Sequence, residues 1–599
     1  MFVVKKRING KTYYYLRDSR RINGKVKAVH VAYLGKDRKK AEQKAFEINW
    51  SLKVGGKDLK TQEFKQNDMK KKVEALKSEA MKSEKKIAEE IENKYEKLME
   101  LASRKSIFYP AAEIYPGSPA GFWDFGPVGH SIRRKIIEFW RKELVQKENM
   151  LEIYGSQILP ASVFEGSGHL KSFTDPIVQC LKCKKFERAD KLISEQLNKI
   201  IPESLSNEEF DELIKKNKIK CPKCGSELSK VSRFNMMVET IVGRGGEFRT
   251  FLRPEACQSI FLDFARMVKT MRLKLPQGIA QAGGAFRNEI SPRQSITRSI
   301  EFSQMEAEVF FDPKKINEIN NFDEVKDYKI RVLRLCKEEI EEFSAEELIK
   351  EKIVPGKLIA YYLARTQQVW NKMGIPLEKL RFREVGKDER AFYSLATFDF
   401  EVETSLGWLE LIANNYRTDY DLKGHMEHSK TDLSYLDQIS GQKIIPHIWE
   451  ISAGIDRTMF ALLDTNLKQG KEGLYLALNP LIAPYYCSVF PLVSKAGMPE
   501  LSKKIEKILK EAWFDIYYDD SGSIGRRYAR SDEIGIPFAI TVDGDSLKAN
   551  DVTIRRRDDG KQIRVKIDNL KEVLRKLIFQ EIEFEKAGKV VESSVKNEQ

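Results

Sequence analysis

The segment 285–293 holds the residue types best suited to chemistry on a phosphate-bearing ligand. It reads Ala-Phe-Arg-Asn-Glu-Ile-Ser-Pro-Arg and separates two strand-like stretches. On the second stretch Gln304, Glu306 and Glu308 alternate with apolar residues, so their side chains share one face of a strand. An arginine fork matches phosphate oxygens at two points, and carboxylates can hold an ammonium group or Mg²⁺. The hairpin therefore suits a ligand with phosphates and an ammonium; the alternative is a surface hairpin of mixed charge.

Four of the seven cysteines form two C-x-x-C pairs, Cys180/Cys183 and Cys221/Cys224. Four thiolates close a tetrahedral zinc site and leave no open position for catalysis. The stretch between the pairs is longer than in a typical zinc ribbon, and its helix-like part, 190–218, can be looped out. The pairs predict structural zinc, with a reduced, metal-free unit as the alternative. The other cysteines, Cys257, Cys336 and Cys487, are expected to be buried small hydrophobes.

Composition predicts a globular protein of three or more domains, because 599 residues exceed a single core. No apolar run approaches the roughly 20 residues that span a bilayer, and the N-terminus lacks the apolar core of a secretory signal. We therefore expect a cytoplasmic protein without a membrane partner. Of the net charge of +15, most lies in residues 1–60, which hold 17 Lys/Arg against 5 Asp/Glu. This local excess favours nucleic acid as a partner; the alternative is a solubilising basic arm.

The first 105 residues are expected to form two units before the main body begins. Residues 1–60 read as a basic three-stranded meander, with strands at 3–8, 12–16 and 26–34 joined by Asn-Gly turns, followed by a helix. This unit is a candidate for nucleic-acid binding, although its aromatic residues could equally be its own small core. Residues 61–105 read as a long charged helix that packs on the body or reaches a nucleic acid, rather than forming a coiled-coil dimer.

Several segments in the main body resemble motifs of the class II aminoacyl-tRNA synthetases. The wording F-R-N-E-I-S-P-R at 286–293 resembles motif 2 of the glycyl family, and 450–457 with the helix-like stretch after it resembles motif 3. A helix at 129–147 and a strand at 150–153, reaching Pro160, resemble motif 1. The segment 251–258 is similar to the R-P-E-T-A-Q signature of glycyl enzymes. The resemblance runs from about residue 108 to about residue 578.

This resemblance implies a fold of the α/β (α+β) class. We expect a class II catalytic domain with an antiparallel sheet at 106–475, and a C-terminal anticodon-binding domain at 479–590. The alternating strands and helices after Asn479 independently predict a compact α/β domain. Two segments look inserted into the catalytic domain: a zinc-ribbon-like subdomain at 175–232 and a charged, helical segment at 313–375.

The resemblance also implies an ATP site. Arg287 and Arg457 are the expected catalytic residues, Arg287 on the α-phosphate and the amino-acid carboxylate, and Arg457 on the γ-phosphate. Glu289 is expected to accept from the adenine amino group, and Glu410 to hold Mg²⁺. The full set of expected ATP-binding residues is Arg287, Asn288, Glu289, Arg298, Ser299, Glu410, Leu411 and Arg457.

A second group of matched residues forms the expected glycine pocket: Glu255, Glu306, Glu450, Ile451 and Ser452. Carboxylates hold the ammonium, and a filled volume excludes larger amino acids by steric clash. The chain departs from the family pattern in three places. Residues 410–417 read Glu-Leu-Ile-Ala-Asn-Asn-Tyr-Arg in place of E-L-V-G-I-A-D-R, Ala256-Cys257 replaces Thr-Ala, and Asp456 precedes Arg457 where glycine or alanine is usual.

The resulting hypothesis is a glycine–tRNA ligase that uses ATP, Mg²⁺ and structural Zn²⁺. Its expected partners are glycine, tRNA(Gly) and a second copy of the chain. The two copies are expected to join through the helix at 129–147, which carries more apolar surface than one buried side usually needs. The alternatives are a non-catalytic, nucleic-acid-binding paralogue, and another class II synthetase such as the prolyl or threonyl enzyme. Candidates for contacts with the anticodon are Arg555, Arg556, Arg557 and Arg564.

Overall fold

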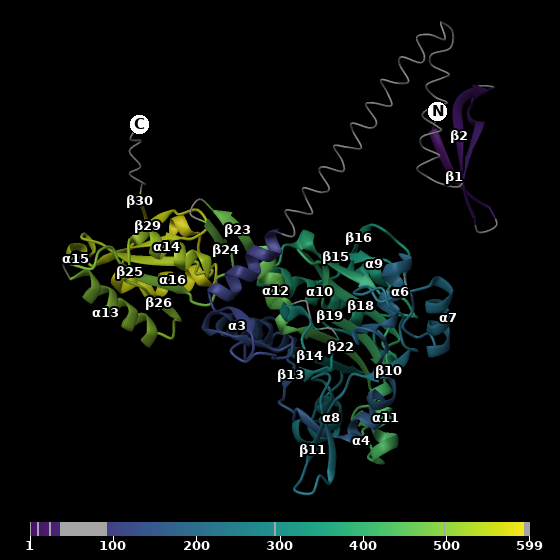
Figure 1. The fold of residues 1–599 in the computed structure, drawn as a ribbon. Helices are drawn as coiled ribbons and strands as arrows, with labels where there is room; N and C mark the ends of the chain where they lie inside the picture. The colour runs from purple at the N-terminus through teal and green to yellow at the C-terminus, as the bar shows by residue number, and fades with distance from the viewer. Residues whose placement is uncertain are drawn as a thin grey trace. The chain divides into compact units, whose positions relative to one another are not determined.

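The structure, a computed structural model, describes residues 2–8, 11–22, 25–35, 93–199, 201–290, 292, 295–470, 473–495 and 497–591. The chain divides into two compact units, Met1–Glu90 and Ile91–Gln599. The first contains an antiparallel sheet in the order β1-β2-β3, which confirms the three-stranded meander (Figure 1). Its strands are β1 Phe2–Ile8, β2 Lys11–Ile22 and β3 Lys25–Gly35, and β2 extends beyond the expected 12–16.

Most of the expected long helix, 61–92, lies outside the described residues, as do 36–60. Residues 93–104 are helical. Among the described residues, no helix combines the length and the apolar character needed to cross a membrane.

The second unit is built around a nine-stranded sheet in the order β16-β15-β17-β18-β19-β22-β14-β13-β6 (Figure 1). The pairs β13–β6 and β15–β17 are parallel, and the other pairs are antiparallel. Its strands are β6 Leu151–Glu152, β13 Gln277–Phe286, β14 Glu301–Phe311, β15 Lys329–Leu333, β16 Ile340–Ser344, β17 Leu380–Glu384, β18 Ala396–Thr404, β19 Gly407–Thr418 and β22 His447–Gly454.

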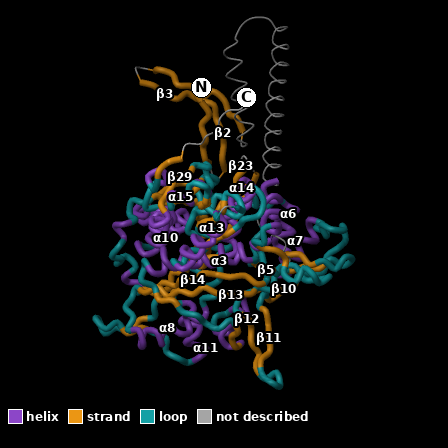
Figure 2. The backbone as a smooth tube through the Cα atoms, turned by 90° about the vertical axis from the view of Figure 1, so that its left-hand side faces the viewer, coloured by secondary structure: helices purple, strands orange, loops and turns teal. Residues whose placement is uncertain are grey.

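One face of this sheet carries the main hydrophobic core. The alternation in β14 buries Met305, Ala307 and Val309 in that core, together with residues of α3, α10 and α12. The opposite face of β14 is polar, as the period-two pattern predicts. Figure 2 shows β13 and β14 running side by side across the body. The covering helices are α3 Pro127–Trp140, α10 Lys357–Met373 and α12 Ile455–Asn466.

The helix expected at 129–147 is present but changes geometry. After α3 the chain continues as a π-helix, Arg141–Gln146, before β6 at the edge of the sheet. The expectation of surplus apolar surface on this helix is wrong, because only Ile137 remains partly exposed. Its other large apolar residues are buried within the same chain: Ile132, Ile136, Phe139, Trp140 and Leu144.

The expectation that 313–375 is a helical insertion is wrong in part. Its hairpin β15–β16 adds two strands to the central sheet, and only α9 Ala345–Lys350 and α10 are α-helical. Ile330 and Val332 alternate with Lys329 and Arg331 and are buried in the main core. The high charge of the segment concealed this strand-like alternation, and α10 belongs to the core rather than to an insertion.

The segment with the paired cysteines has a small core of its own around Val178, Ile193 and Phe210. The helix-like stretch 190–218 contains two helices, because the loop after Leu197 passes through Pro202 and a capping box of Ser206 and Glu209 starts the second. The sheet order is β10-β8-β9. The elements are β8 Thr174–Gln179, β9 Phe186–Arg188, α6 Ala189–Leu197, α7 Asn207–Asn217 and β10 Ser232–Asn235.

Further elements surround the polar face of the central sheet. Helix α8 packs Phe264 on Phe310 of β14, with ring centroids 4.2 Å apart, and so closes one end of that face. The hairpin β11–β12 projects from the body (Figure 2). These elements are β7 Ile158–Pro160, α4 Ala161–Gly166, α5 His169–Ser172, β11 Val238–Val242, β12 Phe248–Leu252, α8 Gln258–Met271 and α11 Tyr420–Ser429.

The strands and helices expected after Asn479 are confirmed. They form a six-stranded mixed sheet in the order β26-β25-β27-β28-β29-β30 with its own core. The elements are β25 Cys487–Pro491, α13 Met498–Glu511, β26 Ile516–Tyr518, α14 Ile524–Glu533, β27 Phe538–Val542, α15 Ser546–Ala549, β28 Asp551–Arg556, β29 Gln562–Lys566, α16 Leu570–Ile578 and β30 Lys589–Val591.

Candidate active site

Register brings the expected pocket residues together on the polar face of the sheet. Glu306 of β14 lies opposite Ser452 of β22, and Glu308 lies opposite Glu450. Directly paired residues on antiparallel strands share a face, so these four side chains form two adjacent rows. Ile451 belongs to the other face and is buried in the main core. Of that residue, only the backbone can line the pocket.

Short hydrogen bonds fix the row that contains Glu306. The hydroxyl of Ser452 donates to Oε1 of Glu306 at 2.7 Å, and Nε2 of Gln304 donates to the same hydroxyl at 3.1 Å. Ser452 thus serves Oε1, whereas Oε2 of Glu306 has no hydrogen-bond partner among the described residues. One carboxylate oxygen is therefore held in place while the other remains available to a ligand.

Arg417 is the functional residue that the sequence analysis did not assign. It is 0% exposed and donates to both carboxylate oxygens of Asp421, at 2.7 and 2.8 Å. It also donates to Glu450 at 3.0 Å and approaches Glu255 at 3.4 Å. A single guanidinium thus ties together carboxylates from three separate segments of the chain.

The run Asn414-Asn415-Tyr416, a departure from the family pattern, aims Arg417 into the pocket. Strand β19 continues through this run, with a bulge between Tyr416 and Thr418. Bulges re-aim side chains, and here the extra residue is Arg417. Asn415 also takes part, because its Nδ2 donates to Oε2 of Glu450 at 2.8 Å. The sequence signal for the role of Arg417 was its match to the arginine that ends the family segment E-L-V-G-I-A-D-R.

Glu255, from the segment similar to R-P-E-T-A-Q, forms the wall above the sheet. Nε2 of Gln258 donates to it at 2.7 Å, and Nε2 of His169 lies 3.4 Å from the same carboxylate. Burial alone would raise the pKa of Glu255, but Arg417 and His169 hold that pKa well below its usual range. Glu255 is therefore the permanently charged carboxylate of the pocket.

Two other carboxylates of the pocket have raised pKa values. Burial, with Glu255 nearby, raises the pKa of Glu306 to about 7. Burial raises the pKa of Glu450 to about 8, although Arg417 opposes this shift. Below these values the neutral carboxylic acid is favoured, and an ammonium ligand loses its charged partner.

We predict that the apparent affinity for an amino-acid ammonium falls as pH decreases from 8.5 to 6. Both groups are deprotonated above about pH 8 and become protonated as pH falls through about 8 and then about 7. The amino-acid KM should therefore rise toward low pH while the ATP KM changes little. A pyrophosphate-exchange pH series measures both constants, and an amino-acid KM that is flat over this range would contradict the prediction.

Arg287 sits at the end of β13, beyond the carboxylates. Its Nε donates to the carbonyl of Pro254 at 3.0 Å, and its guanidinium lies 5.3 Å from the ring centroids of Phe173 and Phe302. Its terminal nitrogens make no hydrogen bond to the part of the chain that the structure describes. The arginine is thus positioned by rings and one carbonyl, with its fork left for a ligand.

Arg457 lies in the first turn of α12. It donates to the carbonyls of Thr297 and Glu410, both at 3.0 Å, and its Nη1 lies 3.5 Å from Oε1 of Glu410. The helix N-terminus adds a modest attraction for anions. The neighbouring Asp456 does not oppose this attraction, because it accepts from Arg133 at 2.8 Å and from the backbone N–H of Ser303 at 2.9 Å.

The remaining expected ATP residues are distributed as follows. Glu289 and Arg298 pair with each other at 2.8 Å rather than standing free. Asn288 is exposed and Ser299 is buried nearby. Leu411 points into the main core, so only its backbone can meet a nucleotide.

Glu410 fits a Mg²⁺ site, since its half-exposed carboxylate lies beside the phosphate-seeking Arg457. Bound there, Mg²⁺ would neutralise phosphate charge.

Comparison with known proteins decides the family. Residues 486–577 match the family model described as an anticodon binding domain. The glycine–tRNA ligase of Methanocaldococcus jannaschii is 37% identical over 570 residues, covering 80% of this chain and 98% of that protein. The glycine–tRNA ligase of Thermococcus gammatolerans is 38% identical over 570 residues, covering 82% and 99%. The chain belongs to the glycine–tRNA ligase family.

Membership of the glycine–tRNA ligase family fits the rows of carboxylates beside Arg287. Family membership does not by itself show that the four candidate arginines contact the anticodon. The structure gives these arginines other partners. Each pairs with a carboxylate of its own domain: Arg555 with Asp532, Arg556 with Glu585, Arg557 with Asp558, and Arg564 with Asp551. These pairs connect the strands and loops of the domain, and contact of the four arginines with the anticodon stays a prediction.

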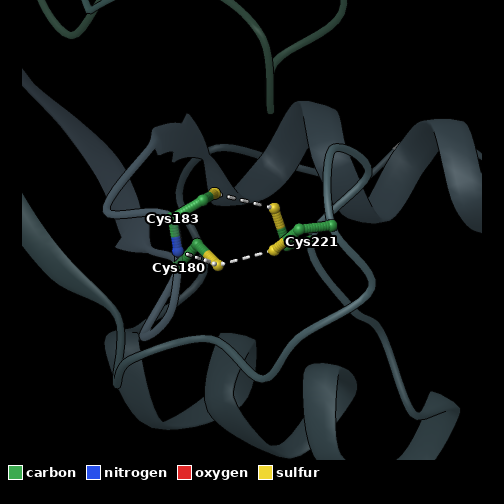
Figure 3. Close-up of side chains that lie close together, drawn as sticks. Cys180, Cys183 and Cys221 are labelled. Atoms are coloured by element: carbon green, nitrogen blue, oxygen red, sulfur yellow. Dashed lines mark hydrogen bonds between the residues drawn. The ribbon is translucent and has the colours of Figure 1, made fainter.

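The paired cysteines of this ligase-family chain converge on one point. Sγ of Cys180 lies 3.4 Å from Sγ of Cys224, and Sγ of Cys183 lies 3.6 Å from Sγ of Cys221 (Figure 3). No disulfide joins them. Zn–S bonds of about 2.3 Å at the tetrahedral angle place sulfurs about 3.8 Å apart, so the cluster fits zinc.

Both pairs share the same backbone device. Lys184 and Gly225 have positive φ, of 60° and 69°, and their N–H groups donate to the carbonyls of Cys180 and Cys221. The repeated turn aims each pair of thiols inward. Of the other cysteines, Cys257 and Cys487 are buried as expected, whereas Cys336 is exposed.

We predict one zinc ion per chain in protein purified without added metal. Replacing Cys221 with serine should abolish zinc retention, because three thiolates leave the tetrahedral site open. Elemental analysis of both proteins measures the stoichiometry. The expectation fails if the Cys221→Ser protein retains a full equivalent of zinc.

Proposed function

We propose that this protein activates glycine with ATP and transfers the glycyl group to the 3′ end of tRNA(Gly). The observation that carries the proposal is the juxtaposition of a buried carboxylate pocket with Arg287, whose terminal nitrogens make no hydrogen bond to the described residues. The pocket suits an ammonium, and Arg287 suits a phosphate and a carboxylate at the same time. A ligand that connects the two regions has the chemistry of an amino acid meeting ATP.

Activation requires the glycine carboxylate to attack the α-phosphorus in line, with pyrophosphate leaving. This step depends on positioning and charge neutralisation rather than on a protein nucleophile. Arg287 would hold the α-phosphate and the attacking carboxylate together, and Arg457 would hold the γ-phosphate. Mg²⁺ held by Glu410 would supply further neutralisation of the phosphates.

Selection of glycine would follow from the pocket walls. Glu255, Glu306 and Glu450 would hold the ammonium, and Ser452 keeps Glu306 oriented. Glu306 and Arg417 are buried and held by hydrogen bonds, so they would not move aside for a side chain on the substrate. Exclusion by clash needs no editing step.

We also propose a cytoplasmic homodimer. The motif 1 helix gives no support for a dimer, because its large apolar residues other than Ile137 are buried within the same chain. Support comes instead from β6, which forms the edge of the nine-stranded sheet. Tyr154 and Ile158, which follow β6, are 74% and 44% exposed. An unpaired strand edge flanked by exposed apolar side chains is typical of a surface that a second chain covers.

The direct test is charging of tRNA with labelled glycine. The protein should charge tRNA(Gly) and leave tRNA with another anticodon uncharged. The non-catalytic alternative predicts tRNA binding without any charging. The non-catalytic alternative gives no role to Arg287, whose terminal nitrogens make no hydrogen bond to the described residues, or to the buried carboxylate pocket beside it.

Deleting residues 1–60 should raise the tRNA KM and flatten its salt dependence. Their 17 Lys/Arg against 5 Asp/Glu would supply backbone affinity that weakens steeply with salt. Glycine activation without tRNA should change little. Charging assays over a series of salt concentrations measure the effect, and a tRNA KM that is unchanged at every concentration would remove nucleic acid as the partner of this unit.

A further inference from the structure

Glu308 is the carboxylate of the site to which neither the family resemblance nor the mechanism gives a task. It is 0% exposed, and neither of its oxygens has a hydrogen-bond partner among the described residues. Oε2 of the neighbouring Glu306 lacks one as well. Three buried acceptor atoms without donors are costly, because a buried carboxylate needs hydrogen bonds or a cation.

A thiol lies beside these acceptors. Ligand atoms of Cys257, Glu306 and Glu308 are all within 4.8 Å of one another, and all three residues are buried. The R-P-E-T-A-Q signature of the glycyl family has alanine at the position of Cys257. The substitution in this chain therefore places one sulfur ligand among oxygen ligands at the floor of the pocket.

The charges around this triad are unbalanced. Arg417 makes its hydrogen-bonded ion pairs with Asp421, Glu450 and Glu255. Glu306 and Glu308 make no ion pair within the described parts of the chain. Arg417 also donates to Sγ of Cys257, at 4.0 Å. Burial raises the pKa of Glu306 to about 7 and the pKa of Glu308 well above its usual range, so a cation bound at the triad would displace their protons and compensate both carboxylates.

The donor set indicates which cation fits. Mg²⁺ and Ca²⁺ prefer oxygen ligands throughout, whereas Zn²⁺ is held by mixed sets of thiolate and carboxylate. On binding, the Cys257 thiol and the protonated carboxyl groups of Glu306 and Glu308 would release their protons to solvent. The sulfur and the two carboxylates would leave a fourth position for water. This position lies in the space that the substrate ammonium would enter.

We propose that Cys257, Glu306 and Glu308 form a second zinc site, separate from the four-cysteine cluster, and that zinc bound there excludes glycine. The competition with glycine rests on the proposed function, but the presence of the site does not. Zinc would then act as a reversible inhibitor of this chain.

The test uses full-length protein whose four-cysteine cluster already holds zinc. Equilibrium dialysis against added Zn²⁺ should show one further ion per chain, and added Co²⁺ should give a thiolate-to-cobalt charge-transfer band while the resident zinc is retained. Cys257→Ala should abolish the band and weaken binding of the second ion by at least about tenfold. Cys487→Ala, which removes a buried thiol from the C-terminal sheet, is the matched control and should retain both signals. If Cys257→Ala does not fold, Glu308→Gln takes its place with the same expected loss of the ion.

Glycine should compete with the second ion, so that the apparent Kd for zinc increases in proportion to glycine concentration. The site is refuted if no second ion binds, or if Cys257→Ala binds it as tightly as the parent. A second ion that is indifferent to glycine would refute the inhibition. Pyrophosphate exchange without added metal, measured in parallel, reports separately whether glycine is the substrate.

Discussion

Replacing Arg287 with alanine should lower glycine-dependent pyrophosphate exchange by about 10²–10³-fold, the usual cost of removing one preorganised contact to a transition state. The terminal nitrogens of the guanidinium make no hydrogen bond to the described residues and would hold the α-phosphate, and the rings of Phe173 and Phe302 hold the guanidinium in position before the ligand arrives. Exchange rates at saturating ATP and glycine measure the loss.

The fold should survive this change. The Arg287 side chain makes one hydrogen bond to the described residues, to the carbonyl of Pro254, and it is only partly buried. The thermal midpoint should therefore stay close to that of the parent. Arg249→Ala is the matched control, because that arginine pairs with Glu239 on the projecting hairpin. Near-normal exchange by a folded Arg287→Ala protein would remove this residue from the mechanism.

Replacing Arg417 with leucine should lower the free energy of unfolding by about 3–5 kcal/mol, because it leaves buried carboxylates without their counter-charge. Asp421, Glu450 and Glu255 would all lose their arginine partner. Urea unfolding followed by tryptophan fluorescence measures the difference. Glycine activation should be lost as well, since Glu255 and Glu450 would no longer be held in place.

The control for this change is Arg575→Leu. The Arg575 side chain is 48% exposed and pairs with Glu581 at the surface. Exposed pairs contribute roughly 0–1 kcal/mol, so this variant should unfold almost like the parent. Equal stability of the Arg417→Leu and Arg575→Leu proteins would contradict the role of Arg417 as the charge centre of the pocket.

The strand alternation in 301–310 was sufficient to predict which face of β14 carries the carboxylates. The two C-x-x-C pairs were likewise sufficient to predict a convergent cluster. In both cases the information is local, since a strand has period two and each C-x-x-C pair forms its own turn. The helix boundaries after Asn479 were also predictable from local sequence.

Features that depend on tertiary partners were not predictable. The role of Arg417 depends on a bulge in β19 and on carboxylates from distant segments. The ion pairs of the C-terminal arginines could not be predicted because their carboxylate partners lie elsewhere in the sequence. The hairpin β15–β16 looked helical because charged residues cover its exposed face, while burial of Ile330 and Val332 determines the fold.

The central claim is that this chain activates glycine, and the most direct test is ATP–pyrophosphate exchange with each of the 20 amino acids in turn, without tRNA. Glycine alone should support exchange, and alanine should fail because its methyl group clashes with the filled pocket. Exchange with proline, threonine or another amino acid at a rate equal to that with glycine would contradict the claim. So would the absence of exchange with any amino acid by folded protein that holds zinc in its four-cysteine cluster and is assayed without added zinc.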